Sequence, residues 1–267
     1  MCIRDRAGKA VVVTDEALLA TYGRAFRKIG KSVVVVPLGR DVHAGHIELI
    51  RAAKSLLGSY VVVTFTGDEV PDIFAEEKVD VVFHGPLETK VRVDSGVDPL
   101  EDSEHTQREV ARILAAINAS HATDVVLGEK DFEVLVATQY AVSGLRMEVK
   151  LHSVPTVRTP NGLAVSLRNA DVPEELREAA LALPAALTAG AHAAEQGAEV
   201  VLETVRGVLA AEGLEPAYLE LRDLAMREAP ERGDARLLAA VDLGPVRLAD
   251  NVGLPLGIGF KHIEEDR

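Results

Sequence analysis

The chain has 267 residues, of which 48% are hydrophobic and 27% charged, enough for one large or two modest domains with buried cores. The formal net charge of −13 argues against a nucleic-acid partner, because binding a phosphate backbone requires clustered Lys and Arg. The single cysteine, Cys2, excludes an intrachain disulfide and a cysteine-based zinc site and favours a cytoplasmic location. No apolar stretch reaches the ~20 residues of a membrane span, so no membrane partner is expected.

From Val11 to about Arg158, short β-branched runs alternate with stretches that have apolar residues at helical spacing. The runs predict strands over 33–36, 60–65, 79–83, 124–127 and 149–154. The helical stretches between them cover 16–29, 47–57, 106–117 and 132–143. Nearly continuous apolar strands alternating with helices predict an α/β fold with a doubly wound, Rossmann-like parallel sheet, whose ligands bind beyond the carboxyl ends of the strands.

The composition shifts toward Ala, Leu and Glu after Asn169. Helical patterns cover 173–188 and 191–211, and short strands are expected over 216–222, 235–243 and 246–250. The Pro and Asn-Gly of Thr159-Pro160-Asn161-Gly162 are turn signals and mark the expected join. We therefore expect a Rossmann-like domain over 1–158 and a smaller α+β C-terminal domain over 159–267.

The most informative motif is His43-Ala44-Gly45-His46, between the strand expected over 33–36 and the helix expected over 47–57. A strand-to-helix turn directs helix N-terminal N–H groups and the positive end of the helix dipole toward a ligand, which creates an anion site. Gly45 allows close backbone approach, and the two histidines can donate to phosphoryl oxygens. The spacing is that of the HxGH signature of nucleotidyl-transferring enzymes, although a histidine pair at a helix start is also often a cap or a surface pair.

Two further segments carry groups suited to phosphate. Gly128-Glu129-Lys130-Asp131 is a second strand-to-helix turn, in which the lysine can neutralise a triphosphate and the aspartate can accept ribose hydroxyls or cap the helix. Ser166-Leu167-Arg168-Asn169 offers a hydroxyl and a guanidinium suited to bidentate phosphate contact. Each segment alone also fits an ordinary polar surface turn.

Taken in this order, the segments resemble the pantothenate synthetase, or pantoate:β-alanine ligase, family from about Val11 to Gly257. The residues that carry the resemblance are Pro37 with His43-Ala44-Gly45-His46, His105, Gly128-Glu129-Lys130-Asp131, Val154-Pro155-Thr156-Val157-Arg158, 162–164, Ser166, Arg168-Asn169, 218–223, Arg236-Leu237-Leu238 and Asp250-Asn251. The resemblance implies an AMP-forming ligase in which ATP and pantoate give pantoyl adenylate and pyrophosphate with Mg²⁺. β-Alanine then attacks the acyl group to give pantothenate and AMP. A homodimer and a mobile second domain are also implied.

The resemblance implies roles for nine residues. Five would hold or neutralise phosphate groups during catalysis: His43, His46, Lys130, Ser166 and Arg168. Four would line the adenosine pocket: Gly45, Gly128, Asp131 and Val157. The metal ligands stay unknown, because the acidic stretch that supplies the magnesium aspartate in the family has no convincing counterpart here.

The departures from the family pattern fall on the acyl side of the expected pocket. The family's Thr-Met-Gly-Ala-Leu turn reads Leu38-Gly39-Arg40-Asp41-Val42, and the pantoate-binding Asn and Gln after the second strand have no counterpart in 65–70. Val134 replaces a second pantoate-binding Gln. Loss of a hydrogen bond to a substrate hydroxyl can cost on the order of 10⁴-fold in turnover, so pantoate turnover is expected to be reduced.

Other residues of the chain are candidate replacements for these lost groups. Arg40 or Arg92 would be a replacement clamp for a carboxylate, and Asp68 with Glu69 would be replacement metal ligands. Two alternatives to the family's reaction stay open: a diverged paralogue that adenylates a different carboxylic acid, and a catalytically weak nucleotide-binding or regulatory subunit.

Overall fold

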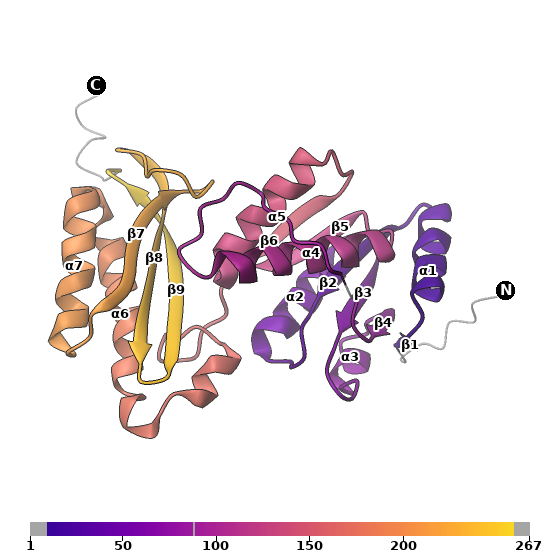
Figure 1. Cartoon of the computed structure of the whole chain (residues 1–267), viewed down its shortest axis with the longest axis horizontal. Helices are drawn as coiled ribbons and strands as arrows, with labels where there is room; N and C mark the ends of the chain where they lie inside the picture. The colour runs from indigo at the N-terminus through magenta and orange to yellow at the C-terminus, as the bar shows by residue number, and fades with distance from the viewer. Residues whose placement is uncertain (1–9, 88, 259–267) are drawn as a thin grey trace. The chain divides into compact units, whose positions relative to one another are not determined.

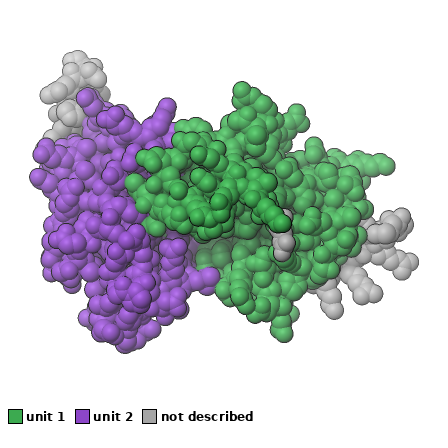
Figure 2. Space-filling view, in the orientation of Figure 1, with its two compact units in different colours: residues 1–129, 133–156 green, residues 130–132, 157–267 purple. Residues whose placement is uncertain are grey.

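The computed structural model describes residues 10–87 and 89–258 (Figure 1). The chain divides into two compact units, Met1–Glu129 with Glu133–Thr156, and Lys130–Phe132 with Val157–Arg267 (Figure 2). The short segment Lys130–Phe132 therefore belongs to the second unit although it follows a strand of the first. Within the described ranges, no helix combines the length and apolarity that crossing a membrane requires.

The first unit is built on a six-stranded sheet in which every neighbouring pair of strands is parallel. The strands are β1 (Val11–Val13), β2 (Ser32–Pro37), β3 (Ser59–Phe65), β4 (Val81–His84), β5 (Asp124–Gly128) and β6 (Lys150–Val154). Their order is β1-β4-β3-β2-β5-β6, so the direction of winding reverses between β2 and β5. The predicted α/β class with a parallel sheet is confirmed, and the three-residue edge strand β1 was missing from the predicted elements.

Helices cover both faces of this sheet. They are α1 (Glu16–Lys28), α2 (Ala44–Ser55), α3 (Ile73–Glu76), α4 (Ser103–Ala119) and α5 (Phe132–Gly144). Because successive side chains of a strand point to opposite faces, Val33 and Val35 of β2 pack in the cluster that contains α1, α4 and α5. Val34 and Val36 pack in the cluster that contains α2 and α3. A strand buried on both faces explains the uninterrupted valine run of the sequence.

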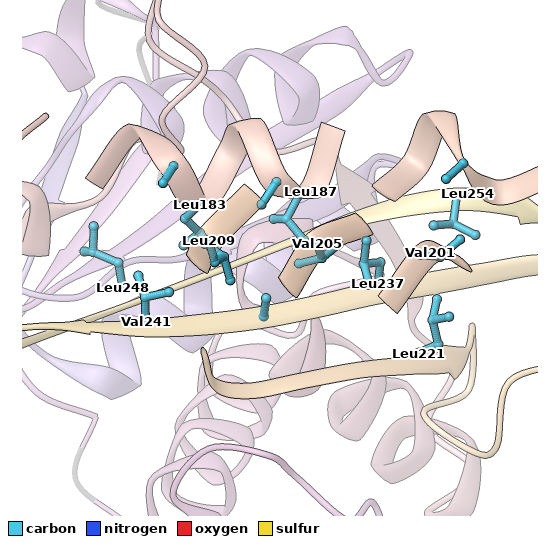
Figure 3. Packing of buried hydrophobic residues seen from close by; sticks show 14 of the residues in the cluster. Leu183, Leu187, Val201, Val205, Leu209, Leu221, Leu237, Val241, Leu248 and Leu254 are labelled. Atoms are coloured by element: carbon cyan, nitrogen blue, oxygen red, sulfur yellow. The ribbon is translucent and has the colours of Figure 1, made fainter. Parts of the chain in front are cut away.

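The second unit has a three-stranded antiparallel sheet with two helices packed on one face. The strands are β7 (Pro216–Asp223), β8 (Gly233–Leu243) and β9 (Val246–Leu256), in the order β7-β8-β9, and the helices are α6 (Ala182–His192) and α7 (Ala198–Ala211). Leu187 of α6 and Val205 of α7 meet Leu237 of β8 in one hydrophobic cluster (Figure 3). Alternate residues of β8 supply the sheet side of this core.

Three predicted boundaries in this unit were wrong. The helical pattern expected over 173–188 is broken into short 3₁₀ turns, and α6 begins only at Ala182. Pro184 explains this start, because proline is tolerated in the first turn of a helix but not in its interior. Gly197, with φ of 95°, ends the preceding turn and delays α7 to Ala198. β9 continues past its expected end because Pro255 lies on an edge strand, where a missing N–H is tolerated.

Two mid-helix glycines of this unit predict opposite responses to alanine. A Cβ at Gly190 of α6 would lie 2.6 Å from Val205 and 3.0 Å from Leu237, whereas a Cβ at exposed Gly207 of α7 meets nothing within 4 Å. We expect Gly190→Ala to destabilise by about 1–3 kcal/mol through overpacking. Gly207→Ala should stabilise by about 0.5–1 kcal/mol, because alanine has the higher helix propensity. Denaturant unfolding followed by circular dichroism measures both, and shifts of the same sign would contradict the packing described.

Candidate functional site

The two histidines of the His43-Ala44-Gly45-His46 motif cap α2 at the carboxyl end of β2. Nδ1 of His43 accepts a hydrogen bond from the Gly45 N–H at 3.1 Å, and Nδ1 of His46 accepts from the His43 N–H at 3.4 Å. The two rings are stacked, with centroids 3.7 Å apart and planes 19° apart. Because an amide N–H can only donate, both Nδ1 atoms act as acceptors, and the hydrogen of each ring therefore lies on Nε2.

Gly45 has a packing role inside the motif. A Cβ at this position would lie 2.9 Å from Cε1 and 3.0 Å from Nδ1 of His43, closer than side chains ordinarily approach. The glycine therefore lets the His43 ring fold back over the first turn of α2 and accept its hydrogen bond. This requirement comes from the helix cap, and it is separate from the expected approach of Gly45 to a ligand.

A cavity of about 660 Å³ opens beside His43, where β2 and β3 end. Its lining comes from the segment after β2 and the segment after β3: Arg40, Asp41, Val42, His43, Ala44, Ile47, Phe65, Asp68, Glu69, Pro71 and Ile73. Nη2 of Arg40 lies 3.1 Å from both carboxylate oxygens of Asp68. With side chains 69% and 83% exposed, this ion pair contributes little stability and can exchange partners. Arg92 donates instead to the Glu104 carboxylate.

Gly67 and His84 hold the loop that carries the lining residues Asp68 and Glu69, and neither was among the predicted site residues. A Cβ at Gly67 would collide with the Arg40 carbonyl and the Phe65 ring, so only glycine permits the close approach of the two loops. Nε2 of His84, at the carboxyl end of β4, donates to the Gly67 carbonyl at 2.8 Å. The sequence did carry a signal, because His84 ends an apolar strand, much as the motif histidines follow one. Its hydrogen-bond partner, Gly67, lies 17 residues away, so no local pattern indicated the contact.

Three of the residues predicted to bind phosphate lie around one small depression of the second unit. Lys130, Ser166 and Arg168 all line it. Nζ of Lys130 lies 3.3 Å from Oδ1 of the exposed Asp131. The Ser166 hydroxyl accepts from the Arg168 N–H at 3.3 Å and caps the short turn Leu167–Asp171. The Arg168 side chain is exposed, so its guanidinium is accessible to an anion.

The remaining predicted residues are placed on both units. Gly128 ends β5 in the first unit, and a Cβ there would make only ordinary contact with Leu49 at 3.7 Å, so packing alone does not require glycine. Val157 is partly buried in the second unit, and its carbonyl accepts from the Val165 N–H at 2.8 Å. Ligand contacts of these two residues stay predictions.

The described residues do not form a protein-built metal centre. Across 10–87 and 89–258, no group of three or more His, Cys, Asp or Glu side chains could hold a metal ion. Asp68, one of the expected replacement ligands, is engaged by the Arg40 guanidinium. Magnesium in nucleotide sites is usually held by phosphates with only one or two carboxylates.

Comparison with known proteins gives one consistent result. The family model for pantoate-beta-alanine ligase matches residues 67–253. The pantothenate synthetase of Corynebacterium jeikeium is 38% identical, over 97% of this chain and 94% of that protein. The pantothenate synthetase of Saccharopolyspora erythraea is 39% identical, over 90% of this chain and 89% of that protein.

Two solved structures share the fold. Pantothenate synthetase from Thermus thermophilus superposes with a TM-score of 0.77 at 24% identity, covering 91% of this chain and 98% of that one. Pantoate-beta-alanine ligase from Francisella tularensis, complexed with β-γ ATP and β-alanine, superposes with a TM-score of 0.70 at 20% identity, covering 91% and 97%.

The histidine cap predicts how α2 responds to substitution. His43→Ala removes the acceptor for the Gly45 N–H and should lower the free energy of unfolding by about 1 kcal/mol. The double variant His43→Ser/His46→Glu replaces the histidine cap by the common capping box and should unfold like the wild type. Denaturant unfolding measures both, and a His43→Ala variant as stable as the wild type would show that the ring does not cap α2.

Proposed function

The chain belongs to the pantoate-β-alanine ligase family, and on that premise we propose that it condenses pantoate with β-alanine at the expense of ATP. The observation that carries the proposal is the histidine cap, which holds two imidazole Nε2–H donors at the carboxyl end of β2. That strand lies beside β5, where the winding of the sheet reverses, the usual ligand position of a doubly wound fold.

In the first step, a pantoate carboxylate oxygen attacks the α-phosphorus of ATP and the bond to the β-phosphate breaks, releasing pyrophosphate. In the second step, the β-alanine amine attacks the acyl carbon, loses a proton and displaces AMP. Neither step requires a covalent enzyme intermediate, so catalysis consists of positioning and charge stabilisation. His43 and His46 donate through Nε2–H to phosphoryl oxygens as negative charge develops on them.

The second unit supplies positive charge for the triphosphate. Lys130 and Arg168 offset phosphate charge, and Ser166 donates its hydroxyl. Local cations matter in a chain with a formal net charge of −13, since the overall field repels an anion. The adenosine contacts are assigned to the four residues of the family pattern: Gly45, Gly128, Asp131 and Val157.

Family membership also supports the accompanying parts of the proposal. Mg²⁺ is proposed to arrive bound to the ATP phosphates and to neutralise part of their charge, with no dedicated protein cage. The protein is proposed to act as a homodimer in the cytoplasm.

A second candidate keeps adenylation and changes the acid. Val134 is partly buried against the hydrophobic cluster under α4 and α5, where the family pattern has a hydrogen-bonding Gln. An apolar side chain there favours an acid with fewer hydroxyl groups than pantoate. Pyrophosphate exchange measured with a panel of carboxylic acids separates the candidates, because the preferred acid gives the fastest exchange. A weak nucleotide-binding subunit would exchange with none of them.

The proposed reaction predicts that purified protein forms AMP and pantothenate, and sustains pyrophosphate release over many turnovers, only when ATP, pantoate and β-alanine are all present. Omitting β-alanine should leave pyrophosphate exchange while abolishing pantothenate formation, because adenylation precedes the amine attack. Chromatographic product analysis measures both. Absence of turnover by protein that binds ATP would contradict the proposal.

The histidine donors predict a loss of rate that is separate from folding. The cap-preserving variant His43→Ser/His46→Glu should lower kcat by at least ~10²-fold, as expected when charge-stabilising donors are removed. Lys130→Ala and Arg168→Ala should mainly raise the KM for ATP. Arg24→Ala, which removes an exposed contact between α1 and His121, is the matched control and should leave both constants unchanged. Wild-type kcat in the double variant would exclude the histidines from the chemistry.

A further inference from the structure

Arg236 and Asn251 are a buried polar pair on the sheet of the second unit. Their neighbours Leu237 and Val252 pack in the hydrophobic cluster with α6 and α7, so strand alternation places this pair on the opposite face. Arg236 is only 8% exposed and Asn251 only 4%. A guanidinium and an amide at this depth are stable only when they are well paired.

The pair is bonded to the segment Lys130–Phe132. Nε of Arg236 donates to Oδ1 of Asn251 at 2.6 Å, and Nδ2 of Asn251 donates to the Lys130 carbonyl at 2.9 Å. The Arg236 guanidinium also lies over the Phe132 ring, 4.4 Å from its centroid. The partners fix the orientation of the amide, because an arginine Nε can only donate and a carbonyl can only accept.

The neighbouring strand leaves room for this arrangement. Gly253 lies opposite Arg236 in the β8–β9 register, and a Cβ at Gly253 would lie 3.4 Å from Nη1 of Arg236. A Cβ there would make close but tolerable contact with the guanidinium, so the glycine gives Arg236 additional room without being required for its position. Arg236 and Asn251 are the two residues of the hairpin that make the contact with the Lys130 carbonyl.

We propose that Asn251, held by Arg236, is a positioning residue that fixes the backbone of Lys130 and thereby the place of its ammonium group. The inference rests on the proposed function of Lys130 in binding the ATP triphosphate. Lys130 lies in a single 3₁₀ turn, Glu129–Asp131, which has little intrinsic stability of its own. The hydrogen bond at Lys130 and the cation–π contact at Phe132 hold the turn at two points, and a displacement of about 1 Å at such a site can cost ~10²-fold in rate.

The test uses Asn251→Asp, which keeps the Oδ1 acceptor for Arg236 and removes the donor to the Lys130 carbonyl. We expect kcat/KM for ATP to fall by about 10- to 100-fold. Arg236→Met, which removes the guanidinium but retains a long apolar side chain, should lower it by a similar factor. The control is Arg247→Ala on the same hairpin, whose exposed ion pair with Asp242 contributes little, and it should leave the constant unchanged.

A double-variant comparison separates positioning from a general structural role. If Asn251 acts through Lys130, Asn251→Asp should change kcat/KM by less than about twofold in a Lys130→Ala background. Equal losses from Asn251→Asp with and without the Lys130→Ala substitution would overturn the proposal.

Hydrogen–deuterium exchange supplies a readout that does not depend on activity. Amides of the peptide covering 129–133 should exchange at least ~10-fold faster in Asn251→Asp and at the wild-type rate in Arg247→Ala. Unchanged exchange in Asn251→Asp would overturn the proposed hold on Lys130. A wild-type protein without ATP-dependent activity would instead refute the proposed function, and the exchange result would still decide whether the network holds this turn.

Discussion

The unsatisfied N–H groups at the start of α2 are the constraint on which the candidate site depends. A helix begins with N–H groups that lack partners within the helix, and here two imidazole Nδ1 atoms accept from the N–H groups of His43 and Gly45. The same hydrogen bonds determine which ring nitrogen carries the hydrogen, and the two rings are stacked with their centroids 3.7 Å apart. One arrangement therefore both caps the N-terminus of α2 and orients the two imidazole donors, and Gly45 supplies the space for it.

The sheet gives this arrangement its position. β2 is buried on both faces and lies beside β5 at the reversal of strand order, so the segments that follow these strands emerge at neighbouring points of one edge. The residues proposed to bind phosphate are divided between the two units: the histidine pair belongs to the first, and Lys130, Ser166 and Arg168 belong to the second. The proposed activity thus requires contributions from both units of the chain.

The sequence predicted the parts of the structure that local patterns control. β-branched runs identified the five strands from β2 to β6. The predicted helix boundaries were wrong where a single residue interrupts a helical pattern, as Pro184 and Gly197 do. The Asn251 contact with Lys130 spans 121 residues, so no local pattern indicates it. The histidine motif was visible in the sequence, but the sequence alone could not show whether the two rings cap the helix. The hydrogen bonds of the two Nδ1 atoms show that they do.

The central claim is that the two imidazoles cap α2 through Nδ1 and meet phosphate through Nε2–H. Nitrogen-15 NMR of labelled histidine, with His43 and His46 assigned from single variants, tests it most directly. The account predicts unprotonated Nδ1 and protonated Nε2 in both rings of the free protein at neutral pH, and a shift of both Nε2 resonances when ATP is added. Rings protonated on Nδ1, or Nε2 resonances unchanged at saturating ATP, would contradict it.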